Sequence, residues 1–531
     1  MKRWNGWGHV ETSKALPAGG LEFLASRIGE GGQPRDASLE TALATVPPSR
    51  LADLPGLEAD EQLRLCHARG QSFADWLALR HGRPGPFPDA VCRPASHEQV
   101  TRMLALARRE GAFVIPYGGG TSVVGHLQVP ADAPPVISLD MSGMDGLLHL
   151  DESARLATLG AGAAGPRVEA QLGRHGYVLG HYPQSFEYST LGGWVVTRSS
   201  GQQSLRYGRI EQLFAGGRLA TPVGDLSLPT IPSSSAGPDL RDLVLGSEGR
   251  LGVLTEASVR VQPRPEREDF HALFFSGWAQ AVAAVRRIAQ ERVPLSMMRL
   301  SNAAETETQL MLAGHPRLIA ALERLLRVRG IHDEKCLLLI GVTGSAKSCR
   351  FARARALEMA RAEGGVHMGR AIGKAWSASR FTGPYLRNTL WEAGYGADTV
   401  ETCVDWPQVT ATVKAIERAA RDCYAEFDEA LHAFTHLSHV YPQGSSVYST
   451  FIFRVTGDYE TDLARWKTLK SRVSRAILAQ GGTISHQHGV GLDHKPYLAA
   501  EKGGETGLAA LRSALASFDP DGMMNPGKLL D

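Results

Sequence analysis

A run of three glycines, Gly118–Gly120, constrains this chain more than any other feature, because it directly follows the apolar stretch AFVIP. A short apolar run bounded by turn residues predicts a buried strand. Glycine lacks a Cβ atom, so its backbone can turn sharply and approach a ligand closely. The loop N–H groups, with the hydroxyls of Thr121 and Ser122, could hold a diphosphate. A tight structural turn explains the same residues, so the loop alone leaves both interpretations open. Its spacing differs from GxGxxG, which argues against a Rossmann NAD site.

The residues around this loop alternate between short strands and helices. Ser96 and Gln99 form a capping box, an apolar stripe follows, and Gly111 ends it, which predicts a helix of about 14 residues. Short β-like runs (PPVISLD, LATLGAG, GVLTEASVRV) alternate with helix-like stretches as far as about residue 265. We therefore expect a fold of the α+β class here, preceded by an N-terminal appendage at residues 1–85.

The pattern changes after residue 268. Strands are predicted at FHALFF, LSMMRLS, CLLLIGV and SSVYSTFIFR, and long helices lie between them and after them. This order predicts a second domain, an antiparallel sheet with helices on one face. The expected division is residues 86–268 for the first domain, 269–480 for the second, and 481–531 for a C-terminal segment whose last residues, FDPDGMMNPGKLLD, are rich in turns.

Composition excludes several functional classes. The 531 residues are 43% hydrophobic and 21% charged, with a formal net charge of +2, which is typical of a globular protein and gives no indication of nucleic-acid binding. Six scattered cysteines without a CxxC pair predict neither a zinc site nor disulfides, and favour a cytoplasmic location. No signal peptide, membrane span or SKL-like ending is recognised, whereas peripheral membrane contact is left open.

A second glycine segment, GVTGSAKS (residues 341–348), nearly matches a P-loop. Ala346 stands where the motif requires the glycine that precedes its lysine. A turn from a strand into a helix explains the same residues, so we do not expect nucleotide triphosphate binding here.

Four separated motifs together resemble one family. IPYGGGTSVVG, GHYPQSFEYSTLGGWVVTRSSGQQSLRYG, LGSEGRLGVLTEASVRVQP and GGTISHQHGVG are similar to the FAD-binding and active-site segments of the alkylglycerone-phosphate synthases, which belong to the vanillyl-alcohol-oxidase superfamily. The opening WNGWG resembles this branch rather than the glycolate or lactate dehydrogenases. The resemblance implies a PCMH-type FAD-binding domain of two subdomains, an antiparallel-sheet cap domain with covering helices, and a homodimer. It also implies that the C-terminal segment, residues 481–531, returns to the first domain.

The resemblance assigns cofactor-binding roles to several residues. The glycine loop would hold the FAD diphosphate, the segment after His181 would line the flavin, and Glu248 with Gly249 would lie beside the adenine and ribose. No RSGGH-like attachment motif occurs, so the FAD is expected to be noncovalent. The expected cofactor-binding residues are Gly118, Gly119, Gly120, Thr121, Ser122, Pro183, Ser185, Thr190, Gly192, Gly193, Thr197, Ser200, Glu248 and Gly249.

Catalytic roles are assigned on the same basis. Alternation along SSVYSTFIFR sends Tyr448 to the polar face of its strand, and the resemblance makes it the catalytic tyrosine. A phenol is a poor base at neutral pH unless cations or donors stabilise its phenolate. Arg387 resembles the arginine that meets the substrate and could bind phosphate or carboxylate in a bidentate manner. Arg299 either organises the site or forms an ordinary salt bridge, and His181 matches an active-site histidine.

The segment Ser485–Gly489 holds the remaining candidates, His486 and His488. The synthases carry three successive histidines here, and Gln487 replaces the middle one. Glutamine can donate and accept hydrogen bonds but cannot become cationic near neutral pH. If the segment is extended, the outer histidines share one side and Gln487 points to the other. A metal site at this His-x-His pair is not expected, because no further ligand motif accompanies it.

The resemblance implies an enzyme that exchanges the acyl group of acyl-dihydroxyacetone phosphate for a long-chain alcohol, using FAD without net redox change. Gln487 puts the proton-transfer part in doubt and could mark another substrate. The main alternative is an FAD-dependent oxidase or dehydrogenase of a 2-hydroxy acid or polyol phosphate. A non-catalytic FAD-binding or lipid-binding subunit is a third hypothesis. All three hypotheses imply a small-molecule or lipid ligand, and for the two enzymes this ligand is a substrate that carries a phosphate or carboxylate.

Overall fold

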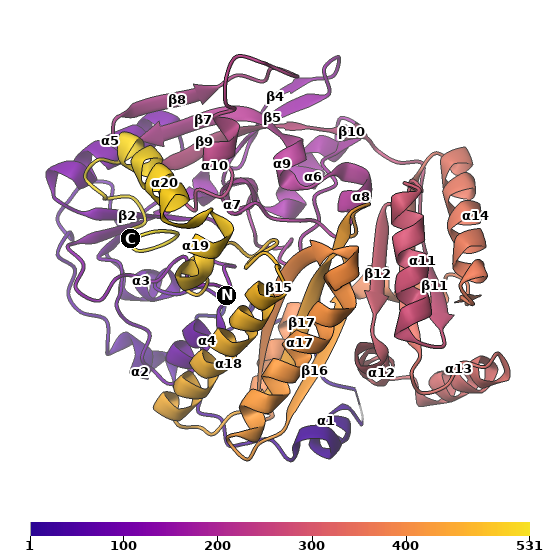
Figure 1. The fold of residues 1–531 in the computed structure, drawn as a ribbon. Coiled ribbons are helices and arrows are strands. Elements are labelled where there is room, and N and C mark those ends of the chain that lie inside the picture. The colour runs from indigo at the N-terminus through magenta and orange to yellow at the C-terminus, as the bar shows by residue number, and fades with distance from the viewer. Residues whose placement is uncertain (1, 18) are drawn as a thin grey trace.

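The computed structural model describes residues 2–17 and 19–531. In Figure 1 the chain forms two bodies, one built by the N-terminal half together with the C-terminal segment and one by the residues between them. The first 85 residues contribute four helices: α1 (Gly20–Ile28), α2 (Leu39–Leu43), α3 (Glu61–Cys66) and α4 (Phe73–Arg80). Trp7, Phe73 and Trp76 belong to the largest apolar cluster of the molecule, so this region supplies part of the core.

A three-stranded parallel sheet carries the glycine loop. Its strands, in the order β1–β3–β2, are β1 (Ala90–Cys92), β3 (Val136–Asp140) and β2 (Phe113–Tyr117), and α5 (His97–Arg109) connects β1 to β2. Ser96 Oγ accepts a hydrogen bond from Gln99 N at 3.3 Å, as the capping box predicts. The Gln99 side chain reaches Ala95 N instead of Ser96 N.

A five-stranded antiparallel sheet forms the other half of this body. Its order is β4–β5–β9–β7–β8, and helices α6 (Gly165–Gly173) and α7 (Leu191–Thr197) contribute to the same apolar cluster. Its strands are β4 (Leu147–Asp151), β5 (Leu156–Gly160), β7 (Phe214–Thr221), β8 (Gly224–Leu228) and β9 (Val253–Arg260).

The second body is a seven-stranded antiparallel sheet in the order β14–β11–β13–β12–β16–β17–β15. Four long helices share one apolar cluster with it, and Figure 1 shows them beside the strands. Two further helices, α13 (Pro316–Val328) and α15 (Ala371–Ser379), pack in a separate cluster with β11, β12 and β13, so coverage is not limited to the expected single face. The strands are β11 (Arg267–Phe275), β12 (Met297–Ser301), β13 (Cys336–Gly344), β14 (Val366–His367), β15 (Tyr395–Asp405), β16 (Leu431–Leu437) and β17 (Gly444–Arg454); the long helices are α11 (Trp278–Gln290), α14 (Ala346–Ala362), α17 (Trp406–Ala425) and α18 (Tyr459–Ala479).

The C-terminal segment returns to the first body. Val114 of β2 donates to Met523 O at 2.9 Å and accepts from Asn525 N at 2.8 Å. Between the active-site loop and this contact lie α19 (Leu498–Glu501) and α20 (Gly504–Phe518). No helix among the described residues is both long and apolar enough to span a bilayer.

Candidate active site

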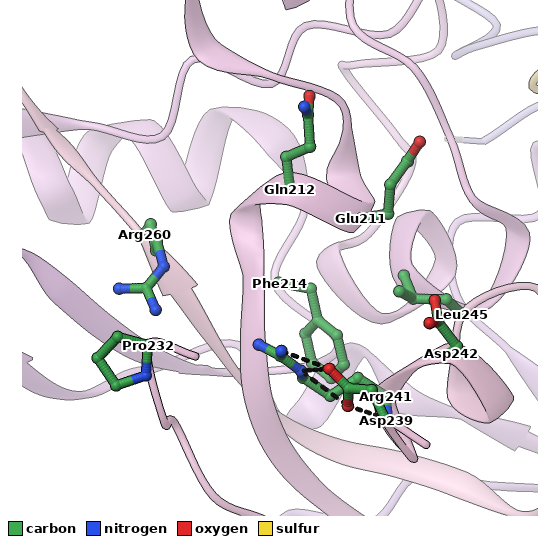
Figure 2. Close-up of a pocket in the computed structure, with 9 residues that line it drawn as sticks. All are labelled: Glu211, Gln212, Phe214, Pro232, Asp239, Arg241, Asp242, Leu245 and Arg260. Atoms are coloured by element: carbon green, nitrogen blue, oxygen red, sulfur yellow. Dashed lines mark hydrogen bonds and ion pairs between the residues drawn. The ribbon is translucent and has the colours of Figure 1, made fainter. Parts of the chain in front are cut away.

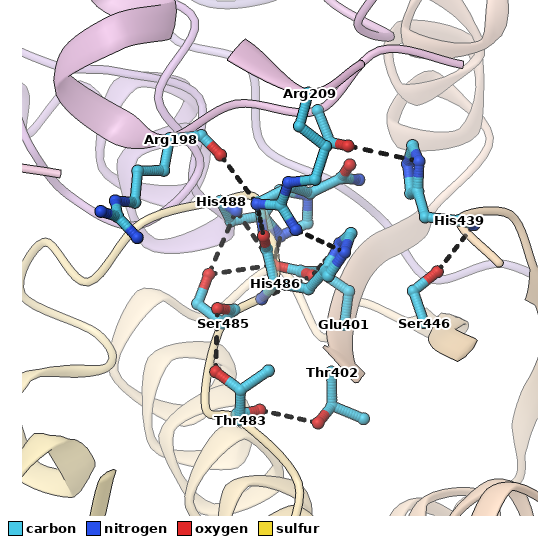
Figure 3. A network of polar contacts seen from close by, with 12 residues as sticks. Arg198, Arg209, Glu401, Thr402, His439, Ser446, Thr483, Ser485, His486 and His488 are labelled. Carbon is cyan, nitrogen blue, oxygen red and sulfur yellow. Dashed lines mark hydrogen bonds and ion pairs between the residues drawn. The ribbon is translucent and has the colours of Figure 1, made fainter. Parts of the chain in front are cut away.

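Glu401 of β15 holds the loop that contains the two histidines. Its Oε2 accepts a hydrogen bond from His486 N at 2.8 Å, and its Oε1 accepts from Gln487 N and His488 N, both at 2.9 Å. Ser485 Oγ donates to the same oxygen at 2.9 Å. Burial alone would raise the pKa of Glu401, but His488 and these donors outweigh it and hold the pKa below its usual value. Figure 3 shows the loop gathered around this carboxylate.

This geometry corrects the expectation of an extended segment. Three successive N–H groups converge on one carboxylate, whereas those of an extended strand would point alternately to opposite sides. Both outer histidines place Nδ1 near the Glu401 carboxylate, at 3.7 Å for His486 and 3.6 Å for His488, but their other neighbours differ. His486 lies against Arg209 and Tyr441, and His488 lies against Tyr448.

His486 is held by a guanidinium. Arg209 Nη1 donates to His486 Nε2 at 2.7 Å, and Arg209 Nη2 donates to the His486 carbonyl at 2.8 Å. A guanidinium can only donate, so Nε2 must accept and the ring proton is assigned to Nδ1. Burial, then the charge of Arg209, lowers the pKa of His486 well below its usual value. His486 is therefore neutral at physiological pH and unsuited to carry a proton.

Tyr448 lies between two imidazoles. It pairs with Glu401 across β15 and β17, stacks on His436 at a ring distance of 4.9 Å, and meets His488 edge to face at 5.6 Å. Burial raises the pKa of Tyr448 to about 12, despite a lowering contribution from its hydrogen bond with Thr399. The phenol is thus protonated at neutral pH and can donate a proton or a hydrogen bond. The predicted split of this strand is observed, because Val447, Phe451 and Phe453 are buried in the core.

Arg387, on α16 (Leu386–Glu392), has donors to spare. Its Nη1 donates to Gln71 O at 2.7 Å, and its guanidinium lies 4.3 Å from the Trp76 ring centre. No carboxylate of the described residues forms an ion pair with it. Burial lowers the pKa of Arg387 to about 10, which still leaves it cationic at neutral pH. A half-buried cation with unused donors is suited to an anionic substrate.

Arg299 on β12 has a different environment. Its Nη2 donates to Glu305 Oε1 at 2.6 Å and lies 3.1 Å from His436 Nδ1. Nδ1 is also 3.0 Å from Glu305 Oε1. Burial alone would raise the pKa of Glu305, but its contacts with His436 and Arg299 outweigh burial and lower the pKa to about 2. His436 stacks on Tyr448, so Arg299 influences the tyrosine by holding His436 in place, while its own charge is paired with Glu305.

Gln487 and His181 lie near His439, which follows β16. The amide Oε1 of Gln487 is buried and lies beside His439. His439 Nδ1 lies 3.1 Å from Ser204 Oγ, and its ring centre lies 5.1 Å from that of His486. His181 is fully buried, with Nε2 2.9 Å from Ser199 Oγ, and burial lowers its pKa to about 3. His181 is therefore neutral.

The glycine loop passes very close to the segment before α7. A Cβ on Gly119 would lie 1.8 Å from the Tyr188 carbonyl oxygen, and one on Gly118 would lie 2.5 Å from Thr190 Oγ1. Gly120 has a φ of +72°, which disfavours other residues. The loop therefore requires glycine, and it ends at the carboxyl edge of a parallel sheet, where ligands bind in such folds. This cradle fits the FAD diphosphate, with Ser122 Oγ hydrogen-bonded to His126 Nδ1 at 2.7 Å beside it.

Several residues expected to line the flavin also build the local structure. Thr190 caps α7 by accepting from Gly193 N at 3.3 Å, and Thr197 Oγ1 donates to Gly193 O at 2.8 Å. A Cβ on Gly192 would lie 2.8 Å from Ala161 Cβ, and Ser200 Oγ lies 3.3 Å from His439 Nδ1. Pro183 and Ser185 carbonyls accept turn hydrogen bonds from Phe186 and Tyr188. Their contact with a flavin stays a prediction.

Glu248 connects the glycine-loop region to the C-terminal segment. Its carboxylate accepts from Val490 N at 2.5 Å and Gly491 N at 2.9 Å, and lies 3.0 Å from His126 Nε2. Gly249 has a φ of +78° and packs on Pro116. Glu248 thus fixes the chain just after His488, and its expected place beside the adenine and ribose stays a prediction.

The residues predicted from the sequence do not include the groups that hold the histidines in place, which are Arg209, Glu305, Glu401, His436 and His439. Glu401 stands in TVETCV, a β-branched run in which one acid is conspicuous, so this run was the available indication. Arg209 had no comparable indication, because its partner lies 277 residues away.

A cavity of about 310 Å³ lies beside α10 (Arg241–Val244), and none of the predicted site residues lines it. Figure 2 shows the residues that line this cavity. Its lining is mostly charged or polar, including the Arg241–Asp239 ion pair.

The P-loop-like segment, residues 341–348, has a structural role at the start of α14. Ser345 caps α14, and Glu266 Oε2 accepts from Ala346 N at 3.0 Å, where an anion would bind.

Comparisons with known proteins agree with this geometry. An FAD binding domain family matches residues 88–227, and the family of FAD linked oxidases, C-terminal domain, matches residues 264–529. The chain is 33% identical over 489 residues to alkyldihydroxyacetonephosphate synthase of Dictyostelium discoideum, covering 89% of this chain and 78% of that protein. It is 31% identical to the Trypanosoma brucei brucei synthase, with coverage of 89% and 78%.

A solved structure of an alkyldihydroxyacetonephosphate synthase superposes with a TM-score of 0.82 at 27% identity, covering 99% of each chain. This likeness and the two domain families confirm the predicted α+β fold, with an FAD-binding domain and an antiparallel-sheet cap domain. FAD is accordingly the cofactor. The chain therefore belongs to the alkyldihydroxyacetonephosphate synthase family of FAD-dependent enzymes.

Proposed function

We propose that this chain converts acyl-dihydroxyacetone phosphate and a long-chain alcohol into the alkyl ether and a free fatty acid, without net redox change. The observation that carries the proposal is the arrangement of Arg387, Tyr448 and His488, in which an unpaired cation accompanies a protonated phenol and a neutral imidazole. The names of the related synthases point to the same substrate class.

Each of the three side chains has a distinct proposed role. Arg387 binds the substrate phosphate, since its guanidinium is cationic and forms no ion pair with a described carboxylate. His488, whose pKa is lowered by burial, accepts the proton of the incoming alcohol. Tyr448 donates a proton or hydrogen bond to the departing carboxylate, because its pKa of about 12 keeps it protonated. Arg299 and His181 act as positioning groups.

FAD, held by the glycine loop through its diphosphate, supplies when bound a ring that can react reversibly at the substrate carbon. Gln487 does not remove the proposed proton acceptor, because His488 and Gln487 have different neighbours. An oxidase or dehydrogenase of a 2-hydroxy acid or polyol phosphate is the outcome that would replace this proposal.

The proposal includes contact with an anionic membrane surface through α13. This helix exposes Leu318 (70%), Leu325 (47%) and Val328 (83%), and carries four exposed arginines within and just after it. Apolar side chains flanked by arginine are typical of helices that lie on lipid. Sedimentation with anionic vesicles should be lost in Leu318→Glu/Leu325→Glu and kept in the exposed control Leu148→Glu. Equal sedimentation of both variants would contradict membrane contact through α13.

A cytoplasmic location and a homodimer complete the proposal. The location is supported by the six unpaired cysteines, and the dimer by the family resemblance. Fractionation of cells and light scattering of the purified protein would test them.

The deciding experiment follows the visible flavin spectrum anaerobically while acyl-dihydroxyacetone phosphate and then a long-chain alcohol are added. Bleaching by the first that the second reverses, with ether product and no electron acceptor, supports the synthase. Bleaching by a 2-hydroxy acid or polyol phosphate that only an oxidant reverses overturns it.

A further inference from the structure

Glu401 makes contacts that a loop anchor alone would not need. Its carboxylate is 1% exposed and accepts four hydrogen bonds from residues 485–488. It also lies 3.7 Å from His486 Nδ1 and 3.6 Å from His488 Nδ1. A carboxylate buried this deeply is costly unless donors surround it, so the loop and the charge depend on each other.

The two imidazoles present the same nitrogen to this carboxylate. For His486 the opposite nitrogen, Nε2, accepts from Arg209, which independently assigns the proton to Nδ1. The same assignment suits His488, because a proton on Nδ1 faces the negative charge. Nε2 of His488 then carries the lone pair and can accept a proton. An acid that fixes the tautomer of a catalytic histidine is a known device of enzymes.

We propose that Glu401 is a positioning residue of the reaction, which fixes the Nδ1–H tautomer of His488 and holds its ring against Tyr448. Tyr448 is the direct cross-strand partner of Glu401, so Glu401 sets the distance between the His488 imidazole and the Tyr448 phenol. The catalytic consequence rests on the proposed function, whereas the tautomer does not.

Other charged groups around His488 and Tyr448 limit the expected size of the effect. Lys470 of α18, His126 of the glycine-loop region and Asp398 of β15 act on His488. Asp398 accepts from Lys470 Nζ at 3.2 Å, so these two largely cancel. Arg299 of β12 and Asp398 act on Tyr448 besides Glu401. Glu401 is the acid that accepts hydrogen bonds from the loop itself.

The sign of the effect follows from charge. The carboxylate attracts a proton onto His488 and repels the phenolate form of Tyr448, so its removal lowers both pKa values. The reaction as proposed needs His488 unprotonated and Tyr448 protonated. In Glu401→Gln both limbs of the pH–rate profile should therefore move to lower pH by about one unit. Its kcat should fall about tenfold to a hundredfold, with KM changed less than threefold.

Two variants separate charge from structure. Glu401→Asp keeps the charge but shortens the reach, so its kcat should fall while the profile stays within about 0.3 pH units of the wild type. It also serves if Glu401→Gln does not fold. Glu417→Gln is the matched control, since Glu417 is a buried acid of α17 that accepts hydrogen bonds from Thr435 of β16 and from Asn302, which directly follows β12. Its profile should not move.

Nitrogen-15 NMR of histidine-labelled holoenzyme provides a readout that does not depend on turnover. His488, assigned with His488→Gln, should show the Nδ1–H tautomer in the wild type and a mixture in Glu401→Gln. An unchanged tautomer, or a profile that drops without moving in Glu401→Gln, would overturn the proposal. If no exchange activity exists, the NMR result still decides the tautomer, so the two failures are distinguishable.

Discussion

At the scale of single residues, the neighbours of a side chain decide its chemistry more than its identity does. His486 and His488 stand one residue apart, yet Arg209 occupies the acceptor nitrogen of the first and an aromatic ring borders the second. The sequence identifies both histidines as candidates. Only the fold shows that Arg209 holds His486, whereas His488 is able to accept a proton.

Tyr448→Phe tests the proposed proton donor. Loss of the hydroxyl should lower the rate of exchange at least a hundredfold, because proton transfer typically contributes ~10²–10⁴. FAD content and thermal stability should be unchanged, since the ring contacts with His436 and His488 remain. Tyr459→Phe, at the start of α18, is the matched control and should keep full activity. More than half of the wild-type rate in Tyr448→Phe would exclude Tyr448 as the donor.

Gln487→His would introduce the histidine that the family resemblance predicts at this position. We expect the rate to stay within about threefold of the wild type, because an imidazole here would enter the environment of His439, whose pKa burial lowers to about 3. It would then be neutral and weakly basic. Steady-state kinetics decide the matter, and a gain of tenfold or more would show that Gln487 limits this chain.

At the scale of elements, the sequence predicts those whose pattern is regular. Ser96 and Gly111 bracket α5 closely, and the alternation of β17 is observed. Strand β15 was not predicted, because Asp398 and Glu401 interrupt its apolar pattern and acids are depleted in strands. These acids are buried because Trp466, Lys470 and the loop N–H groups satisfy them. Such partners cannot be read from the strand itself.

The helices of the N-terminal region and α20 were missed for a related reason. Helix α2 has five residues and α3 has six, too short for a period of 3.6 to appear. Helix α20 carries glycines at 504 and 507, which weaken a helical pattern. The prediction of the glycine loop, by contrast, depends on no periodicity, because the close approach of the Tyr188 carbonyl to Gly119 requires glycine there.

Gly119→Ala tests the loop as a cofactor-binding element. A Cβ here would overlap the Tyr188 carbonyl oxygen, so the loop must move away from the segment before α7. We expect the purified protein to lose most of its FAD, measured as flavin absorbance per chain. Gly146→Ala is the control, because nothing lies within 4 Å of a Cβ at that position. Full flavin occupancy in Gly119→Ala would show that this loop does not contact the diphosphate.

At the scale of the whole molecule, the site is assembled from segments distant in sequence. Arg387 of the cap contacts Gln71 and Trp76 of the N-terminal region. Glu401 of the cap accepts a hydrogen bond from His488 N in the C-terminal loop. Glu248 of the first body accepts one from Gly491 N in the same loop. A site of this kind buries many ionisable groups at once. Across the molecule, burial lowers the pKa of nine histidines, and the shift is large for six of them: His181, His271, His432, His439, His486 and His494.

These histidines should make the protein sensitive to mild acid. Their pKa values are about 3 to 4, and still lower than usual for His486, whereas an unfolded histidine titrates near 6.5. Unfolding therefore takes up protons below that pH, and stability falls as the pH falls. Glu169 and Asp493 oppose this, because burial raises their pKa values to about 7 and the folded state binds their protons first.

Because the buried histidines outnumber these two acids, unfolding takes up protons on balance between pH 6 and 5. The free energy of unfolding should therefore fall by about 1.4 kcal/mol per pH unit for each proton of net uptake. Urea unfolding of the holoenzyme at a series of pH values measures this slope. His432→Gln removes one buried histidine and should reduce the slope by about 1.4 kcal/mol per pH unit, whereas the exposed His149→Gln should leave it unchanged. A free energy of unfolding that stays constant from pH 7 to 5 would mean that these imidazoles already carry protons in the folded state. That result would also contradict the conclusion that His486 is neutral in the folded protein, on which the different roles of His486 and His488 depend.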